Sequence, residues 1–490
     1  MILNEILKDV DYVSISGNAE ADIKGISYDS RKVSQGDIFV AVSGEKVDGH
    51  DFIDDAVRKG AGAVVHEKSG KGYGSVSGTS FILVKDSRKA LAYISNNFFL
   101  RPSEKLSVVG VTGTNGKTTT TYLLKSILET WGKKVGLIGT IQYMIKDEVY
   151  DAVHTTPEAL EFQDLLHHMH ASGCNYVVSE VSSHALAQKR VDGTVFSAGV
   201  FTNLTRDHLD FHKTMEEYFR AKKRLFDELL DKKATSIINY DDIWGRKLIE
   251  AVSGNVFTCG LEIGSDIMAT EIDNTFDGLR FKIIMHGRTY NIISRLMGLP
   301  NVYNILSAAG AAFSLGVPWD IILDGIKKTE PIRGRFEKVD MGQKFLAVID
   351  YAHTEDALER LIFTARGLTK GKIITVFGCG GDRDRGKRPK MGAVATRLSD
   401  FVIITSDNPR SEEPGEIIKE IEAGAVRRNY LVEPDRRDAV KRSVVMASEG
   451  DIVIIAGKGH ETYQDIGGKR FKFSDREVLA EAIRQLINNS

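Results

Sequence analysis

The sequence has little cysteine, little proline and almost no net charge. Its three cysteines lie far apart without C-x-x-C spacing and cannot all pair, as expected for buried thiols in a reducing compartment. A formal net charge of −2 gives no reason to expect nucleic acid or an acidic membrane as a partner. The sequence also lacks a signal-peptide pattern and any run of the roughly 18 apolar residues that a membrane span needs. We therefore expect a cytoplasmic monomer with no nucleic-acid partner and no membrane insertion.

The chain is long and rich in glycine. A length of 490 residues predicts about three domains. Forty-six glycines against nine prolines fit a protein with several tight loops near ligands. Apolar strand patterns alternate with amphipathic helix patterns, which predicts an α/β fold with mostly parallel sheets covered by helices.

The alternation divides into three predicted domains. Residues 1–103 are predicted to form a small α/β domain, with strands at 38–42 and 63–65 and a helix at 52–59. Residues 104–332 are predicted to form a central domain on a mostly parallel sheet, with strands at 106–111, 135–138, 176–178, 198–201 and 236–238 and a helix at 118–131. Residues 333–490 are predicted to form a Rossmann-like α/β domain, with strands at 346–349, 373–377, 401–405 and 452–456 and helices at 355–366, 416–426 and 437–447.

The strongest local signal is a glycine-rich segment between a valine-rich strand and a helix, Gly110-Val-Thr-Gly-Thr-Asn-Gly-Lys-Thr-Thr119. Gly113 and Gly116 free the backbone so that N–H groups converge on phosphate oxygens at a helix N-terminus. Lys117 is placed to reach the β- and γ-phosphates, and the Thr118 hydroxyl to bind Mg²⁺. The spacing differs by one residue from the strict phosphate-loop pattern. A glycine-rich turn that only starts a helix is the alternative, and the flanking strand and helix favour phosphate binding.

The same segment resembles the ATP signature of the Mur ligase family, relatives of folylpolyglutamate synthetase. Further blocks resemble the family in its order along the chain: Glu180-Val-Ser-Ser-His184, Thr202-Asn-Leu-Thr-Arg-Asp-His-Leu-Asp210, Ala221-Lys222, Asn301 with Asn304, Gly334-Arg335 and Asp350-Tyr-Ala-His353. Within the family, the chain is similar to members that add the third amino acid, on the blocks Asp29-Ser-Arg31, Thr155-Thr156-Pro157, Gly378-Cys-Gly-Gly-Asp-Arg383, Asp407-Asn-Pro-Arg410 and Gly457-Lys-Gly-His-Glu461. The resemblance implies an ATP-dependent amide-bond ligase of cell-wall peptidoglycan synthesis.

The resemblance implies catalytic roles for Lys117, Glu180, His208 and Lys222, with Mg²⁺ bound at Thr118, Glu180, His208 and Lys222. The matching lysine in the family is carbamylated by CO₂, which would give Lys222 an oxygen anion able to approach a second Mg²⁺. From the residues alone, Glu180 and His208 are predicted to follow strands, where open α/β sheets place ligands. Without the resemblance, Lys222 is only one of several charges on a solvated helix face. The implied ATP contacts are Gly113, Thr114, Asn115, Gly116, Lys117, Thr118, Thr119, Asn301, Asn304, Arg335, Asp350 and His353.

The implied carboxylate substrate is a UDP-linked muramoyl dipeptide. ATP would phosphorylate its free D-Glu carboxylate, and the amine of a diamino acid would then attack the acyl phosphate. Closure of the last domain would exclude water from that acyl phosphate. The residues implied to hold this substrate are Tyr28, Ser30, Glu45, Lys46, Val47, Thr155, Thr156, Ser182, Gln188 and Arg190. The alternative interpretation of the hydroxyls is that they cap helices.

The implied diamino-acid site consists of Arg383, Asp407, Asn408, Pro409, Arg410, Gly457 and Glu461. Arg410 is expected to pair with a distal carboxylate through two parallel hydrogen bonds, and Glu461 to take the ammonium. Asn408 is expected to supply an amide to either group. The block resembles the meso-diaminopimelate form of the family, and a close isostere such as lanthionine remains equally compatible. The alternative is that Asn408-Pro409-Arg410 forms only a loop turn.

Three rival functions remain at this stage. One is a sibling ligase of the same family that adds L-lysine or acts at another step, against which Arg410 and the Thr155-Thr156-Pro157 block argue. Another is a P-loop kinase or GTPase, which leaves Lys222 and the 407–410 block unexplained. The third is a non-catalytic nucleotide sensor, which would be expected to have lost Lys117, Glu180 or His208. All three residues are present.

Overall fold

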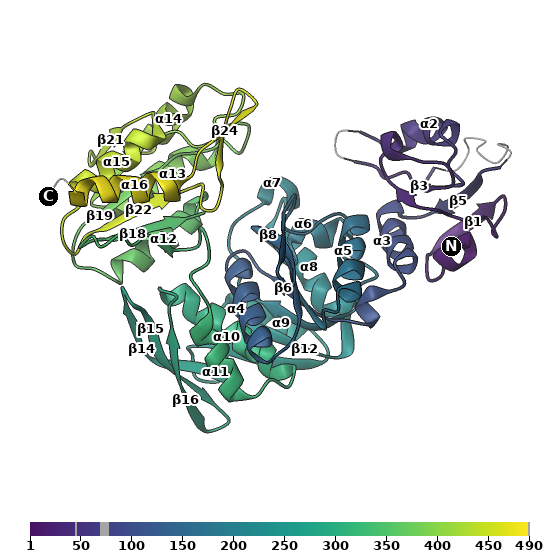
Figure 1. Cartoon of the computed structure of the whole chain (residues 1–490), viewed down its shortest axis with the longest axis horizontal. Helices are drawn as coiled ribbons and strands as arrows, with labels where there is room; N and C mark the ends of the chain where they lie inside the picture. The colour runs from purple at the N-terminus through teal and green to yellow at the C-terminus, as the bar shows by residue number, and fades with distance from the viewer. Residues whose placement is uncertain (45–46, 69–77, 489–490) are drawn as a thin grey trace.

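The computed structural model describes residues 1–44, 47–68 and 78–488. The chain forms three lobes in a row, and the central lobe lies between the N-terminal and C-terminal lobes (Figure 1). Each lobe is built on its own β-sheet, so the predicted α/β class is confirmed. No helix within the described ranges has the length and apolar character that crossing a membrane requires.

The N-terminal lobe has a five-stranded sheet in the order β1-β5-β4-β3-β2, parallel except for β1. Its strands are β1 Tyr12–Ser16, β2 Ile26–Ser27, β3 Ile38–Val40, β4 Ala63–His66 and β5 Ser80–Val84. Its α-helices are α1 Leu3–Ile6, α2 Ile53–Arg58 and α3 Ser87–Phe98. The strands predicted at 38–42 and 63–65 are confirmed as β3 and β4. Sequence patterns missed β1 because it is an edge strand with mostly exposed residues and no apolar face.

The central lobe has an eleven-stranded sheet in the order β16-β15-β14-β13-β12-β11-β6-β10-β7-β8-β9. Each strand from β14 across to β7 in this order is parallel to its neighbours in that run. Antiparallel pairing adds β15 and β16 at one edge and β8 and β9 at the other. The strands are β6 Ser107–Thr112, β7 Val135–Ile138, β8 Gln142–Ile145, β9 Glu148–Asp151, β10 Tyr176–Glu180, β11 Phe196–Phe201, β12 Leu230–Asn239, β13 Asn255–Gly260, β14 Ile267–Thr275, β15 Gly278–Met285 and β16 Arg288–Ser294. The α-helices are α4 Lys117–Thr130, α5 Ala159–Ala171, α6 Ser183–Ala187, α7 Leu209–His212, α8 Met215–Arg224, α9 Ile243–Ala251, α10 Leu299–Ser314 and α11 Trp319–Lys328.

The C-terminal lobe has a six-stranded sheet in the order β17-β18-β22-β19-β20-β21, parallel except for β17. Its strands, with a separate hairpin of β23 and β24, are β17 Glu337–Lys338, β18 Leu346–Asp350, β19 Ile373–Phe377, β20 Phe401–Ile404, β21 Tyr430–Val432, β22 Ile452–Ala456, β23 Tyr463–Ile466 and β24 Lys469–Lys472. Its helices are α12 Glu355–Arg366, α13 Lys387–Leu398, α14 Pro414–Glu422, α15 Arg436–Met446 and α16 Asp475–Asn488. The helix predicted at 416–426 is wrong in its bounds, because proline is tolerated in the first turn and lets α14 begin earlier.

Helix α4, which begins where the glycine-rich loop ends, packs into the core of the central lobe. Leu123, Leu124, Ile127 and Leu128 are fully buried, and the helix packs on α10 and α11 in one apolar cluster. Strand β6 lies between β11 and β10, at the centre of the parallel region. The loop between β6 and α4 therefore opens at the carboxyl edge of the sheet, where open α/β folds bind ligands.

Candidate active site

The glycine-rich loop joins β6 to α4 as predicted, and two of its glycines are sterically required. Gly113 has φ +146° and Gly116 has φ +88°. A Cβ on Gly113 would lie 1.9 Å from the Thr202 hydroxyl oxygen, and one on Gly116 would lie 2.3 Å from Asn304 Oδ1. Asn304, on α10, thus comes to the loop as expected, and its Nδ2 donates to Asn301 Oδ1 at 2.9 Å.

Lys117 begins α4 and its ammonium turns back over the loop. It donates to the carbonyl oxygens of Gly113 and Thr114, both at 2.9 Å. Burial lowers the pKa of Lys117, while the Glu180 carboxylate opposes that shift. Carbonyl oxygens are weak partners for an ammonium compared with phosphate. The ammonium therefore lies beside the loop N–H groups. A phosphate bound there would replace the two carbonyl oxygens as the hydrogen-bond acceptor of Lys117.

Lys222 is buried, and the interpretation of it as a solvated surface charge is wrong. Its side chain on α8 is only 1% exposed, and its Nζ donates to Gly113 O at 2.7 Å. The ammonium also lies 4.7 Å from the centre of the Tyr218 ring, one helical turn earlier. Burial, helped by the nearby Lys117 charge, holds the pKa of Lys222 well below its usual value. Its neighbour Lys223 instead pairs with Asp227 on the helix surface.

Glu180 is the last residue of β10, immediately beside β6, and is buried. Its Oε1 accepts from the Thr140 backbone N–H and its Oε2 from the Thr140 hydroxyl, both at 2.9 Å. Thr140 was not predicted as a site residue, although a hydroxyl shortly after β7 was an available signal. Thr140 also bonds the predicted substrate residue Thr155, with 3.0 Å between their hydroxyl oxygens.

His208 does not directly follow a strand, which corrects its expected position. It lies in the loop between β11 and α7, in the left-handed conformation with φ +53°. Its ring packs edge-on against His184, with 4.8 Å between centroids. The side chain is 44% exposed, and partial desolvation, helped by His184 and the two lysines beside the phosphate loop, lowers the pKa of His208 to about 4, so the imidazole is neutral at neutral pH and able to donate a lone pair.

The oxygen ligands around the loop suit Mg²⁺, which retains bound waters, better than a metal ion whose ligands are all protein side chains. Within the described ranges, no three His, Cys, Asp or Glu side chains gather as a metal cluster. Mg²⁺ keeps several waters and binds one or two carboxylates together with substrate phosphates. Buried Glu180 and the buried Thr118 hydroxyl, both near Lys117, match that pattern.

The C-terminal lobe reaches the loop through two side chains. Arg335 Nη2 donates to the Thr118 hydroxyl at 3.2 Å, so this predicted residue is brought to the loop. Asp356 Oδ2 accepts from Thr205 Oγ1 at 2.9 Å and from Asn115 Nδ2 at 3.3 Å. Asp356 was not predicted as a site residue. It follows the helix-capping Thr354 in the first turn of α12 and gave no signal beyond its acidic character.

Two other predicted ATP residues are held mainly by their own lobe. Asp350 ends β18, and its carboxylate accepts from the backbone N–H groups of Phe336 and Ala352 at 2.7 and 2.8 Å. Burial raises the pKa of this carboxyl group. His353 is exposed, with Nδ1 2.9 Å from Tyr351 O. Thr119 is buried at the start of α4.

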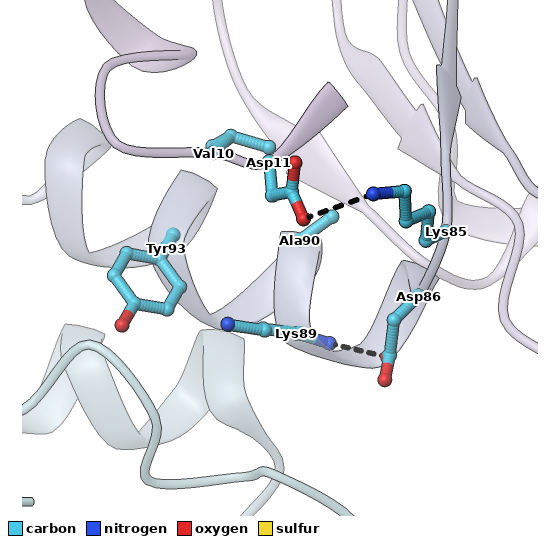
Figure 2. Close-up of a pocket in the computed structure, with 7 residues that line it drawn as sticks. All are labelled: Val10, Asp11, Lys85, Asp86, Lys89, Ala90 and Tyr93. Atoms are coloured by element: carbon cyan, nitrogen blue, oxygen red, sulfur yellow. Dashed lines mark hydrogen bonds and ion pairs between the residues drawn. The ribbon is translucent and has the colours of Figure 1, made fainter. Parts of the chain in front are cut away.

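The residues predicted for the muramoyl substrate divide between two lobes. Tyr28 links them, because its hydroxyl donates to Glu161 Oε1 on α5 at 2.8 Å. Ser30 is buried in a short 3₁₀ turn and Val47 is exposed, whereas Glu45 and Lys46 lie outside the described residues. This lobe also has a cavity of about 30 Å³ lined by Lys85, Lys89 and Tyr93 among others, which holds little more than a water (Figure 2).

The central-lobe substrate residues are held in a compact network. Ser182 caps α6 by accepting from Ala185 N at 3.2 Å, so the helix-cap interpretation holds for it. Thr156 Oγ1 donates to Glu180 O at 2.8 Å. The Arg190 guanidinium pairs with Glu158 at 2.8 Å and donates to Gln188 Oε1 and to Thr156 O, so it belongs to the same network.

The predicted diamino-acid residues meet in the C-terminal lobe, where β20 and β22 end. Asn408 Nδ2 donates to Glu461 Oε2 at 2.8 Å, and Arg410 donates to the Gly381 carbonyl. Arg410 itself has φ +52°. Gly457 is required, because its φ is +113° and a Cβ would lie 2.6 Å from Asp407 Oδ2. Arg383 is exposed and donates to Asp382 O at 3.2 Å.

The Asn408 side chain already has partners within its own lobe. Its Oδ1 accepts from Lys458 Nζ and from the Asp465 backbone N–H, both at 2.9 Å, and its Nδ2 serves Glu461. Lys458 was missed as a site residue, although it lies inside the glycine-rich block after β22. Pro409, between Asn408 and Arg410, completes the turn, and its carbonyl accepts from Glu412 N at 3.0 Å.

Family models match most of the chain. Residues 22–99 match the Mur ligase family catalytic domain, residues 111–312 the Mur ligase middle domain, and residues 334–459 the Mur ligase glutamate ligase domain. The chain belongs to the Mur ligase family. The family resemblance drawn from the sequence blocks is therefore confirmed.

Two relatives show how far the likeness extends. The UDP-N-acetylmuramoyl-L-alanyl-D-glutamate–2,6-diaminopimelate ligase of Clostridium tetani is 44% identical over 99% of this chain and 100% of its own length. The ligase of the same name from Caldanaerobacter subterraneus is 45% identical over 99% of both chains. This Mur ligase is thus similar to both from end to end.

Solved structures agree with the fold. A structure of a UDP-N-acetylmuramoyl-L-alanyl-D-glutamate–2,6-diaminopimelate ligase superposes with a TM-score of 0.72 at 32% identity, covering 99% of both chains. The MurF ligase of Thermotoga maritima in complex with ADP superposes with a TM-score of 0.62 at 20% identity, covering 96% of this chain and all of that one. The second likeness supports the fold alone.

Proposed function

We propose that this chain is an ATP-dependent ligase that adds meso-diaminopimelate, or a close isostere such as lanthionine, to the D-Glu carboxylate of a UDP-linked muramoyl dipeptide. The names of the full-length relatives support the two substrates. The observation that carries the ligase chemistry is the buried Lys222 ammonium on the Gly113 carbonyl of the phosphate loop. A P-loop kinase or GTPase has no evident use for that lysine.

In the proposed first step, the γ-phosphoryl group passes from ATP to the D-Glu carboxylate, giving ADP and an acyl phosphate. The loop N–H groups and the Lys117 ammonium hold the phosphates and offset their charge. Lys222, as a neutral amine, is able to react with CO₂ and become a carbamate, because its lowered pKa favours the unprotonated form. Thr118, Glu180, His208 and the Lys222 carbamate are the residues that would hold Mg²⁺, which supplies charge neutralisation when bound.

In the second step, the amine of the diamino acid attacks the acyl carbon, the amide bond forms, and inorganic phosphate leaves. Arg335 and Asp356 join the C-terminal lobe to the loop, which supports a site shared by the two lobes. Arg190 is proposed to orient a substrate carboxylate from the central lobe, and Tyr28, Ser30 and Val47 to face the UDP end. Closure of the lobes keeps water from the acyl phosphate.

The test is phosphate release by the purified full chain with ATP, Mg²⁺ and the UDP-linked muramoyl dipeptide, over a panel of amino acids. We expect release only when a diamino acid is present, with meso-diaminopimelate or lanthionine far ahead of L-lysine, and a UDP-linked tripeptide by mass spectrometry. Preference for L-lysine would favour the sibling ligase. Phosphate release without any amine, or transfer to a hydroxyl acceptor, would contradict the ligase assignment.

A further inference from the structure

A single peptide unit in the C-terminal lobe joins Arg410 to a carboxylate outside the proposed diamino-acid site. The unit consists of the Gly381 carbonyl and the Asp382 N–H, in the loop after β19. Its carbonyl accepts from the Arg410 guanidinium, and its N–H donates to Glu412 Oε1 at 2.6 Å. Because a peptide unit is planar and rigid, the orientation of its N–H also sets the orientation of its carbonyl. Glu412 therefore holds the plane to which the Arg410 guanidinium is bonded.

The backbone around this peptide unit is tightly packed and locally strained. Asp382 has φ +53°, in the left-handed region that residues with side chains adopt rarely. A Cβ on Gly381 would lie 1.9 Å from Pro409 O, so the loop after β19 packs directly on the loop after β20. The Asp382 carboxylate also accepts from the Ser411 hydroxyl at 2.6 Å. That contact holds the Asp382 side chain, whereas Glu412 contacts the N–H of the peptide unit itself.

Glu412 is in turn held by a buried arginine. Arg388, on α13, is fully buried and donates to both Glu412 oxygens, at 2.8 Å to Oε1 and 2.9 Å to Oε2. Arg388 also donates to Gly380 O at 3.2 Å and to Glu420 Oε2 at 2.8 Å. Arg385 lies 3.4 Å from the Glu412 carboxylate and 2.8 Å from that of Glu420. Two arginines thus meet two glutamates, so these four side chains carry no net charge.

Glu412 and Glu420 are a matched pair that differs in one contact. Both pair with Arg388 and Arg385, and their side chains are 20% and 34% exposed. Of the two, Glu412 is the one that accepts from the Asp382 N–H. Loss of either carboxylate leaves Arg388 with the other, but loss of Glu412 also releases the peptide unit that bonds Arg410.

We propose that Glu412 is a positioning residue for diamino-acid specificity, which fixes the Gly381–Asp382 peptide unit and so aims Arg410 at the distal carboxylate of the substrate. A guanidinium forms two parallel hydrogen bonds to a carboxylate in a narrow range of orientations, and a displacement of about 1 Å can cost a factor of about 100 in rate. L-lysine has no distal carboxylate, so its use does not depend on that aim. The inference rests on the proposed function and deepens it.

The experiment is a competition in which meso-diaminopimelate and L-lysine are offered together and both UDP-linked tripeptides are quantified by mass spectrometry. The product ratio reports the ratio of kcat/KM values and does not depend on how much of a variant is correctly folded. Glu412→Ala removes the acceptor of the Asp382 N–H, and Glu412→Gln restores an acceptor oxygen without the charge. Glu420→Ala removes the equivalent ion pairs and leaves the peptide unit untouched.

We expect the diaminopimelate-to-lysine ratio to fall by about 10- to 100-fold in Glu412→Ala, through a higher KM for meso-diaminopimelate, with the KM for ATP within about twofold of wild type. The ratio should stay within about threefold of wild type in Glu412→Gln and in Glu420→Ala. In an Arg410→Ala background, Glu412→Ala should change the ratio by less than about twofold, because the residue that it aims is absent.

Four results would overturn the inference. They are an unchanged ratio in Glu412→Ala, an equal fall in Glu420→Ala, an equal fall in Glu412→Gln, and a full further fall when Glu412→Ala is added to Arg410→Ala. Equal falls in both alanine variants would mean that the cluster only stabilises the lobe. Failure of the proposed function is distinct, because the wild-type chain would then form no diaminopimelate product at all.

Discussion

The ammonium groups of Lys117 and Lys222 donate to one and the same oxygen, the Gly113 carbonyl, at 2.9 and 2.7 Å. One lysine comes from the phosphate loop and the other from α8, far along the chain. Two cations on a single neutral acceptor repel each other, which helps to lower the pKa of Lys222. The pair marks a place that requires anions, and phosphate oxygens or a carbamate would supply them.

Lys117→Ala is expected to reduce kcat by about 100-fold or more while leaving the fold intact. The ammonium is the loop's positioned cation for the developing γ-phosphate charge, and removing one such group typically costs about 3–4 kcal/mol. Steady-state phosphate release measures the loss, and far-UV circular dichroism checks the fold. Lys125→Ala is the control, because Lys125 lies on the same helix and pairs with Glu129 at its surface. Similar activity in the two variants would contradict the ATP-site assignment.

Lys222→Ala is expected to be nearly inactive and partly rescued by added formate or acetate, since a small carboxylate can replace the missing carbamate oxygens beside Mg²⁺. Lys223→Ala is the matched control one residue away, on the solvent side of α8. Stripping CO₂ and bicarbonate from the wild type is expected to lower its activity reversibly. A Lys222→Ala enzyme that turns over at the wild-type rate would reduce Lys222 to a buried structural residue.

The phosphate loop could be predicted from the sequence, as could five strands of the central sheet and four of the C-terminal sheet, because their apolar runs and glycines act locally. The edge hairpins β8–β9 and β14–β16 were not predicted, nor were β13, β17 and β21. The burial of Lys222 could not be predicted, because the Ala-Lys-Lys-Arg run carries charges on several helix faces and tertiary packing decides which face is inside. Tyr218, four residues earlier, was the available signal, since it shares that face. Thr140 and Lys458 were not predicted for a similar reason, because each contacts a site residue that is distant in the sequence.

Asp356→Ala is expected to lower kcat/KM for ATP by about 5- to 30-fold, because it removes the hydrogen bonds that join the C-terminal lobe to Thr205 and Asn115, each typically contributing about 1 kcal/mol. Glu355→Ala is the neighbouring control, since Glu355 lies no closer than 3.8 Å to its charged partner Lys390. Initial rates over a range of ATP concentrations measure the effect. Equal kinetics in both variants would show that this contact is incidental to catalysis.

Arg436→Met is expected to destabilise the C-terminal lobe by about 3–5 kcal/mol, because Asp475 would be left as a buried charge without its partner. The two side chains are both fully buried and pair at 2.8 Å. Arg437→Met is the control, since its pair with Glu481 is half exposed and worth well under about 1 kcal/mol. Chemical denaturation of the two variants gives the difference. A loss of comparable size in both would contradict the assignment of the buried pair as the stabilising element.

Arg410→Ala is expected to narrow the preference for diaminopimelate over L-lysine, chiefly by lowering the diaminopimelate efficiency. The guanidinium is aimed by its bond to the Gly381 carbonyl, and a distal carboxylate would take two of its remaining donors. Losing such a pair in a closed site costs on the order of 2–5 kcal/mol, a factor of tens to thousands. L-lysine offers no carboxylate there, so its weak use should change little. Steady-state kinetics with each amino acid, with Arg397→Ala as a surface control paired to Glu359, separates these outcomes. An equal drop for both substrates would mean that Arg410, held at a positive φ, only maintains the shape of the loop.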